Sequence, residues 1–134
     1  MEAPPPKLSV VVPVLDEADG LPELHRRLAS SVGSLEGGVE VVYVDDGSTD
    51  GSREAIERLA VESPLSVTLV RLSRNFGMEI AMSAGLDHAR GDHVALMHAD
   101  LLDPPELLPD MLALADGGAD VVYARRIGRD EGAV

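Results

Sequence analysis

Short apolar runs alternate along the chain with segments whose apolar residues recur at helical spacing. Continuous runs rich in β-branched residues predict strands at 8–14, 39–44, 66–72 and 120–124, with a further run that begins at His93. Helical spacing between these runs predicts helices from about residue 21, around 55–60, over 78–89 and around 107–115. Such alternation predicts an α/β fold: a Rossmann-like parallel sheet with helices on both faces.

The run that begins at His93 is the element around which we expect the site to form. It reads as a buried strand that delivers His98, Asp100 and Asp103 to one edge of the sheet. Because side chains alternate along an extended segment, His98 and Asp100 are expected to face the same way as a ligand pair. Asp103 stands before two prolines and three residues before Glu106, so we expect it to be the N-cap of a capping box.

Other polar residues follow the remaining predicted strands at their carboxyl ends. Parallel α/β sheets bind ligands at this edge, so we expect a single site there. The polar groups in question are Asp16 and Glu17, then Asp45 and Asp46, then Arg71 to Asn75, and finally Arg125, Arg126 and Arg129. Two further polar residues receive ordinary roles: His25 is expected to be solvated and Asp50 to cap a helix.

Composition narrows the class of protein. A chain of 134 residues with 45% hydrophobic content predicts one domain with a real core, at 8–129, between a flexible leader at 1–7 and a tail at 130–134. A net charge of -13 argues against nucleic acid as a partner. The absence of cysteine and of any apolar run near the roughly 20 residues of a membrane span makes the cytoplasm the expected location. The first residues lack the features of a signal peptide.

Four motifs on these elements together resemble the family 2 glycosyltransferases of the GT-A fold. The nearest branch is that of the polyprenyl-phosphate glycosyltransferases, which includes dolichol-phosphate mannosyltransferase. The likeness covers residues 8–129, and the chain is C-terminally short for the family. The motifs are Val12-Pro13-Val14-Leu15-Asp16-Glu17, Val44-Asp45-Asp46-Gly47-Ser48-Thr49-Asp50, Ser73-Arg74-Asn75-Phe76-Gly77 and Ala99-Asp100-Leu101-Leu102-Asp103-Pro104-Pro105-Glu106.

The resemblance implies roles for individual residues. Asp46 is the stronger candidate for a nucleoside contact, whereas Asp45 either contacts the nucleoside or shapes the turn. The family's Asp-x-Asp motif falls on His98 and Asp100, which implies a catalytic centre with Mg²⁺ or Mn²⁺ that also includes Asp103. Arg125, Arg126 and Arg129 match basic residues that contact phosphate in the family, although a solvated tail is nearly as good an interpretation. The residues with an implied nucleotide-binding role are Pro13, Leu15, Asp16, Glu17, Asp45, Asp46 and Asn75.

The implied reaction moves a hexose, with inversion, from a UDP- or GDP-sugar to an undecaprenyl or dolichyl phosphate. The second pKa of a phosphate monoester is about 6, so the nucleophile is already ionised and needs no strong base. This agrees with the absence of a histidine obviously paired with a carboxylate in the sequence. A membrane-bound acceptor implies that the protein acts at the cytoplasmic face of the membrane, as a peripheral protein. It also implies a homo-oligomer or a membrane protein as partner.

Two departures from the family pattern keep other interpretations open. Histidine at position 98 brings no negative charge and suits Mn²⁺ or Zn²⁺ better than Mg²⁺, and Leu102 replaces a glutamine common in this branch. A non-catalytic nucleotide-sugar-binding module and the N-terminal part of a split or truncated transferase are the alternatives. A phosphoacceptor signalling domain fits poorly, because Lys7 is the only lysine and the acidic pair does not follow the first strand.

Overall fold

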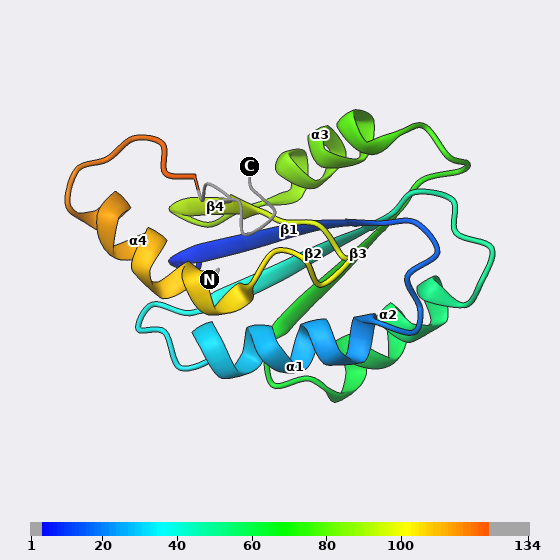
Figure 1. Cartoon of the computed structure of the whole chain (residues 1–134), viewed down its shortest axis with the longest axis horizontal. Helices are drawn as coiled ribbons and strands as arrows, with labels where there is room; N and C mark the ends of the chain where they lie inside the picture. The colour runs from blue at the N-terminus through cyan, green and yellow to red at the C-terminus, as the bar shows by residue number, and fades with distance from the viewer. Residues whose placement is uncertain (1–3, 124–134) are drawn as a thin grey trace, which may run out of the picture.

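The computed structural model describes residues 4–123, which form a sheet flanked by helices (Figure 1). A turn of 3-10 helix, η1, precedes the last helix. In chain order the elements are β1 (Leu8–Val14), α1 (Leu21–Val32), β2 (Val39–Asp45), α2 (Ser52–Glu62), β3 (Ser66–Arg71), α3 (Met78–His88), β4 (His93–Leu96), η1 (Pro105–Leu107) and α4 (Leu108–Asp116). Within the described residues, no helix has the length and apolar character that crossing a membrane requires.

The sheet is parallel, with strand order β3-β2-β1-β4. Val10 of β1 lies opposite Val41 of β2 on one side and Ala95 of β4 on the other. Every residue of β1 and β2 is buried, as expected for inner strands of a parallel sheet that is covered on both faces. The predicted α/β fold is confirmed, and all four strands end at the same edge of the sheet, on the right in Figure 1.

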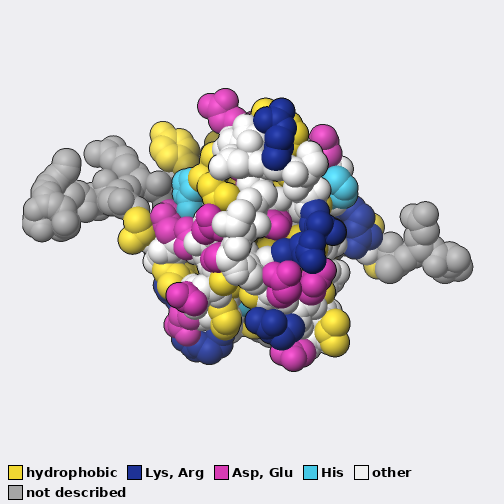
Figure 2. Space-filling model, turned by 90° about the vertical axis from the view of Figure 1, so that its right-hand side faces the viewer, with side chains coloured by type: hydrophobic (Ala, Val, Ile, Leu, Met, Phe, Trp, Pro, Cys, Tyr) yellow, Lys and Arg dark blue, Asp and Glu magenta, His cyan; other side chains and the backbone are white. Residues whose placement is uncertain are grey.

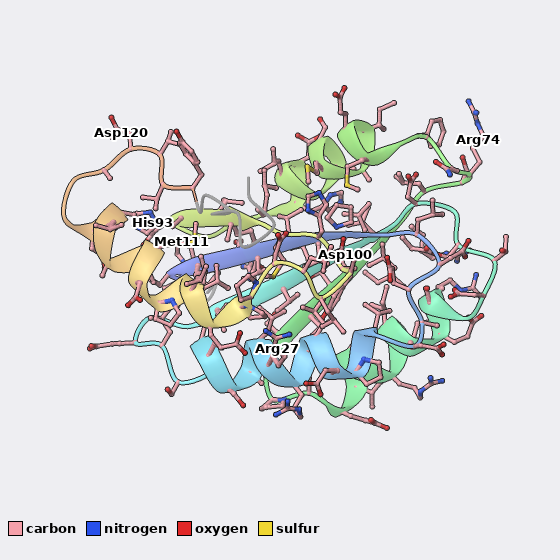
Figure 3. All side chains as sticks on the ribbon, viewed as in Figure 1. Arg27, Arg74, His93, Asp100, Met111 and Asp120 are labelled. Atoms are coloured by element: carbon pink, nitrogen blue, oxygen red, sulfur yellow. The ribbon has the colours of Figure 1, made fainter. Side chains whose placement is uncertain are left out.

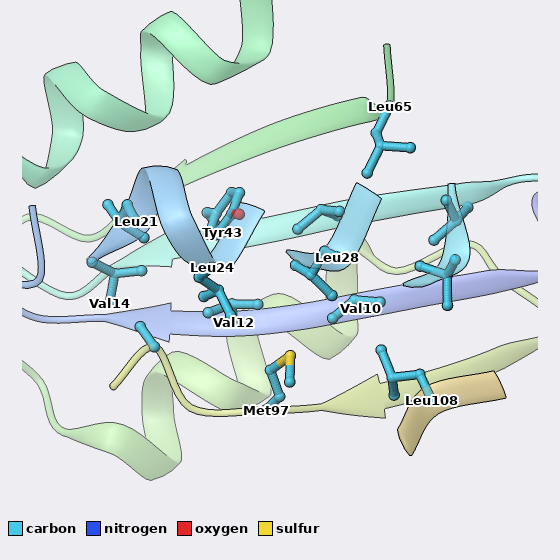
Figure 4. Packing of buried hydrophobic residues seen from close by; sticks show 14 of the residues in the cluster. Val10, Val12, Val14, Leu21, Leu24, Leu28, Tyr43, Leu65, Met97 and Leu108 are labelled. Atoms are coloured by element: carbon cyan, nitrogen blue, oxygen red, sulfur yellow. The ribbon is translucent and has the colours of Figure 1, made fainter. Parts of the chain in front are cut away.

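Helices α1, α2 and α4 cover one face of the sheet and α3 covers the other (Figure 1). On the first face, Leu24 and Leu28 of α1 pack against Val10 and Val12 of β1 in the main core (Figure 4). On the second face, the small residues of α3 allow a close approach: a Cβ added to Gly85 would lie 2.3 Å from Val11 Cγ1. The helices therefore cover the sheet from both sides.

Two strand predictions are wrong. β4 is an edge strand rather than a buried one, because Val94 and Leu96 are 43% and 48% exposed and only β1 pairs with it among the described residues. Residues 120–123 form no strand, and Ala124 lies outside the described residues. Val121 and Tyr123 are 78% and 79% exposed, so this segment buries little apolar surface to offset the entropy cost of ordering a strand.

His25 is buried, so the expectation that it is solvated is wrong. Its Nδ1 lies 2.7 Å from the Tyr43 hydroxyl and its Nε2 lies 2.6 Å from Ser63 Oγ. Both ring nitrogens therefore have hydrogen-bond partners, which offset the desolvation cost of burying this polar side chain. Desolvation lowers the pKa of His25 and raises the pKa of Tyr43.

The domain boundaries at 8–129 stay a prediction. Lys7, within the predicted leader, forms an ion pair of 2.6 Å with Asp116 at the end of α4, and His93 Nε2 lies 3.3 Å from the same carboxylate. These contacts fasten α4 to the starts of β1 and β4, at the edge of the sheet opposite the expected site.

Candidate functional site

The loops after β1 and β2 are joined by reciprocal hydrogen bonds at the carboxyl edge. The Asp16 backbone N–H donates to Ser48 Oγ at 2.9 Å, and the Thr49 N–H donates to Asp16 Oδ1 at 2.8 Å. Asp16 has a positive φ of 54°, a conformation that aspartate tolerates better than most residues. The Asp16 carboxylate thus joins the two loops through Oδ1, and its other oxygen has no hydrogen-bond partner among the described residues.

A second pair of contacts ties the same loops together one turn further along. The Glu17 N–H donates to Ser52 Oγ at 2.9 Å, and the Ala18 N–H donates to Asp50 Oδ2 at 3.1 Å. Asp50 Oδ1 accepts from the N–H of Ser52, the first residue of α2. Gly51 holds the N-cap position and no side-chain cap is present there, so Asp50 is not the N-cap residue that the sequence suggested. The Ser52 hydroxyl hydrogen bond lowers the pKa of Asp50. The serines were not among our candidate residues, although the cap-rich turn that contains them was visible in the sequence.

The two adjacent aspartates at the end of β2 have different partners. Asp45 Oδ1 accepts from the Ser48 N–H at 3.1 Å and shapes the turn that follows. Asp46 accepts from two backbone amides of the loop before α3, Phe76 N–H at 2.8 Å and Gly77 N–H at 3.1 Å. Both aspartates are buried. Asp46 therefore anchors the loop that carries the exposed Asn75, and Asp45 keeps its second oxygen without a partner among the described residues.

Gly47 brings the β2–α2 turn into close contact with that same loop. It has a φ of 85°, and a Cβ added there would lie 2.5 Å from the backbone nitrogen of Asn75. Only glycine fits both the conformation and the space. A hollow of about 320 Å³ opens beside this contact, and Ser48, Arg71 and Arg74 are among its lining residues. Arg74 stacks over the Phe76 ring, with its guanidinium carbon 4.3 Å from the ring centroid.

The turn after β4 holds His98, Asp100 and Asp103. Asp103 Oδ2 accepts from the backbone N–H of His98 at 2.9 Å and also lies 3.0 Å from His98 Nδ1. Asp100 Oδ1 accepts from the Leu102 N–H at 3.0 Å, and Leu101 between them has a positive φ of 67°. Because strand β4 ends at Leu96, the alternation rule used to pair His98 with Asp100 does not apply to this turn.

The expectation that Asp103 is the N-cap of a capping box is wrong. No side-chain cap is present at the start of η1 or α4, because Asp103 turns back to His98. The two prolines offer no N–H to a cap, and the Leu107 N–H donates to the Pro104 carbonyl instead. Glu106 forms a bidentate pair with Arg27 of α1 at 2.6 and 2.9 Å, which lowers the pKa of Glu106 to about 2. This pair fixes η1 on α1.

Two histidines are paired with carboxylates, which the sequence did not suggest. One pair is His98 with Asp103 at the carboxyl edge, and the other is His93 with Asp116 at the opposite edge. Only the first pair lies near the candidate site residues.

Carboxylates concentrate at the carboxyl edge. Burial raises the pKa of Glu17 above its ordinary value, and the neighbouring carboxylates of Asp100, Asp50 and Asp16 raise it further. In Figure 2, which looks onto this edge, Asp and Glu side chains gather beside Lys and Arg side chains. Figure 3 places Asp100 near the middle of the edge and Arg74 on the loop before α3. An anionic ligand therefore meets both signs of charge here.

The other predicted site residues have clear positions. Pro13 is buried within β1 opposite Val44, and Leu15 is 42% exposed directly after the strand. Across residues 4–123 there is no cluster of three or more histidines or carboxylates arranged to hold a metal ion. Asp100 and His98 would need further ligands from another molecule. All three predicted phosphate-binding residues lie outside the described residues: Arg125, Arg126 and Arg129.

Solved structures of glycosyltransferases share this fold. TarS of S. aureus, residues 1–349, superposes with a TM-score of 0.71 at 29% identity over 83% of this chain and 32% of that chain. Its complex with UDP-GlcNAc gives a TM-score of 0.70 at 30% identity, with coverage of 83% and 31%. The mannosyltransferase PcManGT of Pyrobaculum calidifontis, in complex with GDP-Man and Mn²⁺, gives 0.59 at 32% identity, with coverage of 77% and 30%.

Sequence relatives agree with the structural ones. The undecaprenyl-phosphate 4-deoxy-4-formamido-L-arabinose transferase of Salmonella choleraesuis is 40% identical over 129 residues, which is 96% of this chain and 39% of that protein. The chain thus spans about two fifths of the length of the curated relatives it matches. The family model described as Glycosyl transferase family 2 matches residues 9–134. The chain belongs to glycosyltransferase family 2.

Proposed function

We propose that this chain is the nucleotide-sugar-binding part of a glycosyltransferase that transfers a sugar from a UDP- or GDP-sugar to a polyprenyl phosphate. The observation that carries the proposal is the convergence of four connections at one sheet edge, the first three of which are cross-linked by Asp16, Asp46 and Asp50. The similarity to an undecaprenyl-phosphate sugar transferase supports this acceptor class. The hexose inferred from the family resemblance stays a prediction, because that relative's name specifies an arabinose derivative.

The hydrogen bonds of the aspartates suggest how the nucleotide is held. Asp46 already accepts hydrogen bonds from two backbone amides, so it affects nucleotide binding indirectly, because it positions the loop that carries Asn75. Asp45 has a free carboxylate oxygen and can accept from the base or ribose. Leu15, exposed after β1, offers an apolar surface against the base. Asp46 remains the site residue whose loss we expect to weaken binding most.

A divalent cation fits the charge of this edge. A nucleotide diphosphate is repelled by the carboxylates of Asp16, Glu17, Asp50 and Asp100, and a cation between them removes that repulsion. Two of the structural relatives contain Mn²⁺, PcManGT and a glucosyl-3-phosphoglycerate synthase of Mycobacterium tuberculosis. Asp100 and His98 would hold the ion together with oxygens of the ligand. When bound, such an ion neutralises the charge that develops on the leaving diphosphate.

The acceptor places weak demands on the protein. A phosphate monoester with a second pKa of about 6 is mostly ionised at neutral pH, so no residue has to remove its proton. The site must instead orient the two substrates and exclude water between them. Because a polyprenyl phosphate resides in a membrane, we propose peripheral association with the membrane surface, for which the arginines at 125, 126 and 129 are the candidate contacts.

A non-catalytic nucleotide-sugar-binding module is the second candidate. It is favoured by position 98, where a histidine stands in place of the first aspartate of the family's Asp-x-Asp motif. Its fold and its nucleotide contacts would be the same, and only the transfer step would be missing.

Two measurements on the 134-residue chain test these proposals. Isothermal titration with UDP-GlcNAc, UDP-glucose and GDP-mannose in the presence of Mn²⁺ measures nucleotide-sugar binding. A radiolabel assay with undecaprenyl phosphate measures transfer. Binding with transfer supports the transferase, and no binding of any nucleotide sugar contradicts both proposals. Binding without transfer is expected of the module, and also of a nucleotide-binding part that needs further elements of the transferase for the transfer step.

A further inference from the structure

Asp103 holds the His98 ring and the His98 backbone at the same time. A single oxygen, Oδ2, accepts from the backbone N–H at 2.9 Å and lies 3.0 Å from ring Nδ1. A carboxylate can only accept, so Nδ1 carries the proton and donates it to Asp103. The lone pair of the ring is then on Nε2, which has no hydrogen-bond partner among the described residues.

This arrangement is the one that prepares a histidine to bind a metal. Metal-binding histidines usually donate their second ring N–H to a carboxylate or carbonyl, which fixes the tautomer and raises the basicity of the ligating nitrogen. Asp100 supplies a carboxylate two residues along the same turn, with one oxygen that no described residue occupies. The turn is shaped independently of any ligand by the hydrogen bond from the Leu102 N–H and by the left-handed Leu101.

The two donors differ in kind from a pair of carboxylates. Mg²⁺ prefers an all-oxygen octahedron and gives up its waters reluctantly, so an imidazole in place of a carboxylate weakens its site. Mn²⁺ and the later transition metals accept imidazole nitrogen well, in the order of increasing affinity from Mn²⁺ to Cu²⁺. His98 also carries no negative charge when neutral, which removes part of the attraction on which Mg²⁺ depends.

We propose that His98 Nε2, with Asp103 as its positioning residue, makes this edge selective for imidazole-accepting divalent ions such as Mn²⁺ over Mg²⁺. The inference rests on the proposed function, because the two protein donors need the oxygens of a nucleotide diphosphate to complete the coordination of the ion. Asp103 acts through His98.

Nitrogen ligation can be observed directly. Pulsed electron paramagnetic resonance of Mn²⁺ bound to the chain with UDP or GDP detects the ¹⁴N nucleus of a coordinated imidazole. We expect a ¹⁴N coupling in the wild type, its loss in His98→Asp and its retention in His88→Asp. His88 is an exposed histidine at the end of α3 whose Nδ1 bonds only to the Ala84 carbonyl, so this control removes an imidazole away from the site.

Titration of UDP and GDP measures selectivity on the same variants. The wild type should bind the nucleotide at least about tenfold more tightly with Mn²⁺ than with Mg²⁺, a ratio that His98→Asp should reduce towards one by a gain with Mg²⁺. Asp103→Asn should weaken Mn²⁺-supported binding by about 10–100-fold, the usual cost of losing a partner of a metal-binding histidine. Thermal melting of each variant without ligand shows whether it is folded, and the wild-type resonance measurement needs no variant.

The failures of the inference and of the proposed function are distinguishable. Nucleotide binding that Mg²⁺ supports as well as Mn²⁺, or a wild-type Mn²⁺ complex without ¹⁴N coupling, overturns the role of His98 and leaves nucleotide binding intact. No binding of either nucleotide with any ion overturns the proposed function, and the inference with it.

Discussion

Replacing Asp46 with alanine should detach the loop that leads into α3. The change removes both acceptors of the Phe76 and Gly77 amides, at 2.8 and 3.1 Å. A hydrogen bond to a charged group contributes about 1.5–3 kcal/mol, so the two set an upper bound of about 3–6 kcal/mol. Both hydrogen bonds are part-buried, so water can replace some of the lost contacts. We therefore expect a loss of about 2–3 kcal/mol in the free energy of unfolding.

Nucleotide affinity should fall together with stability in this variant, because Asn75 lies on the released loop. Asp50→Ala is the matched comparison: it also removes a carboxylate that bonds to backbone amides at the same edge, but its partners are in the β1–α1 loop and at the start of α2. Asp46→Asn keeps one carbonyl acceptor and should lie between the wild type and Asp46→Ala.

Urea denaturation gives the free energy of unfolding of each variant, and calorimetric titration with UDP- and GDP-sugars gives its affinity. We expect Asp46→Ala to weaken nucleotide binding far more than Asp50→Ala. Equal losses of affinity in the two variants, with stability unchanged in both, would refute the anchoring role of Asp46.

Three further predictions concern other parts of the chain. Gly47→Ala should lower the free energy of unfolding by about 1–3 kcal/mol, because alanine is strained at a φ of 85° and its Cβ would lie 2.5 Å from the Asn75 nitrogen. A melting temperature equal to that of the wild type would contradict this prediction. Burial lowers the folded-state pKa of His25, so the unfolded state takes up the extra proton at a higher pH than the folded state does. The free energy of unfolding should therefore be highest above about pH 6.5 and fall as the pH drops through the folded-state pKa. Chemical denaturation of His25→Gln should not show this pH-dependent loss. Glutamine in place of the three arginines outside the described residues, Arg125, Arg126 and Arg129, should reduce binding to anionic liposomes that carry a polyprenyl phosphate, or binding to the nucleotide diphosphate. If liposome sedimentation and nucleotide titration both show no loss of binding, these arginines are only solvated charge.

The sequence predicted the inner part of the fold well because that part depends on local pattern. The continuous apolar run of β1 was bounded correctly, and the buried run of β2 extends only one residue further, to Asp45. Both strands are covered on two faces, so their pattern is almost continuously apolar. The polar residues Ser9 and Glu40 within them are buried and hydrogen-bond to each other at 2.6 Å. The collection of polar residues at one edge followed from the parallel topology alone.

The errors arose where the outcome depends on which partner a residue or a strand meets in the folded chain. An apolar strand such as β4 gives no sign of whether a neighbour covers its outer side. Asp103 has two local uses, as a cap or as a partner of His98, and the prolines that suggested a helix start are also what removed the amides a cap would need. His25 found Tyr43 and Ser63, which are 18 and 38 residues away along the chain.

The most direct test of the account is to map where a nucleotide sugar binds. Amide hydrogen exchange of the chain with and without UDP-GlcNAc or GDP-mannose, in the presence of Mn²⁺, reports protection at each segment. We predict protection at 15–18, 45–52, 74–77 and 98–103, the connections that meet at the carboxyl edge, and none at 33–38, at the opposite edge. Protection confined to the hollow of about 640 Å³ between β4 and α4, or absent from the carboxyl edge with saturating ligand, would contradict the account.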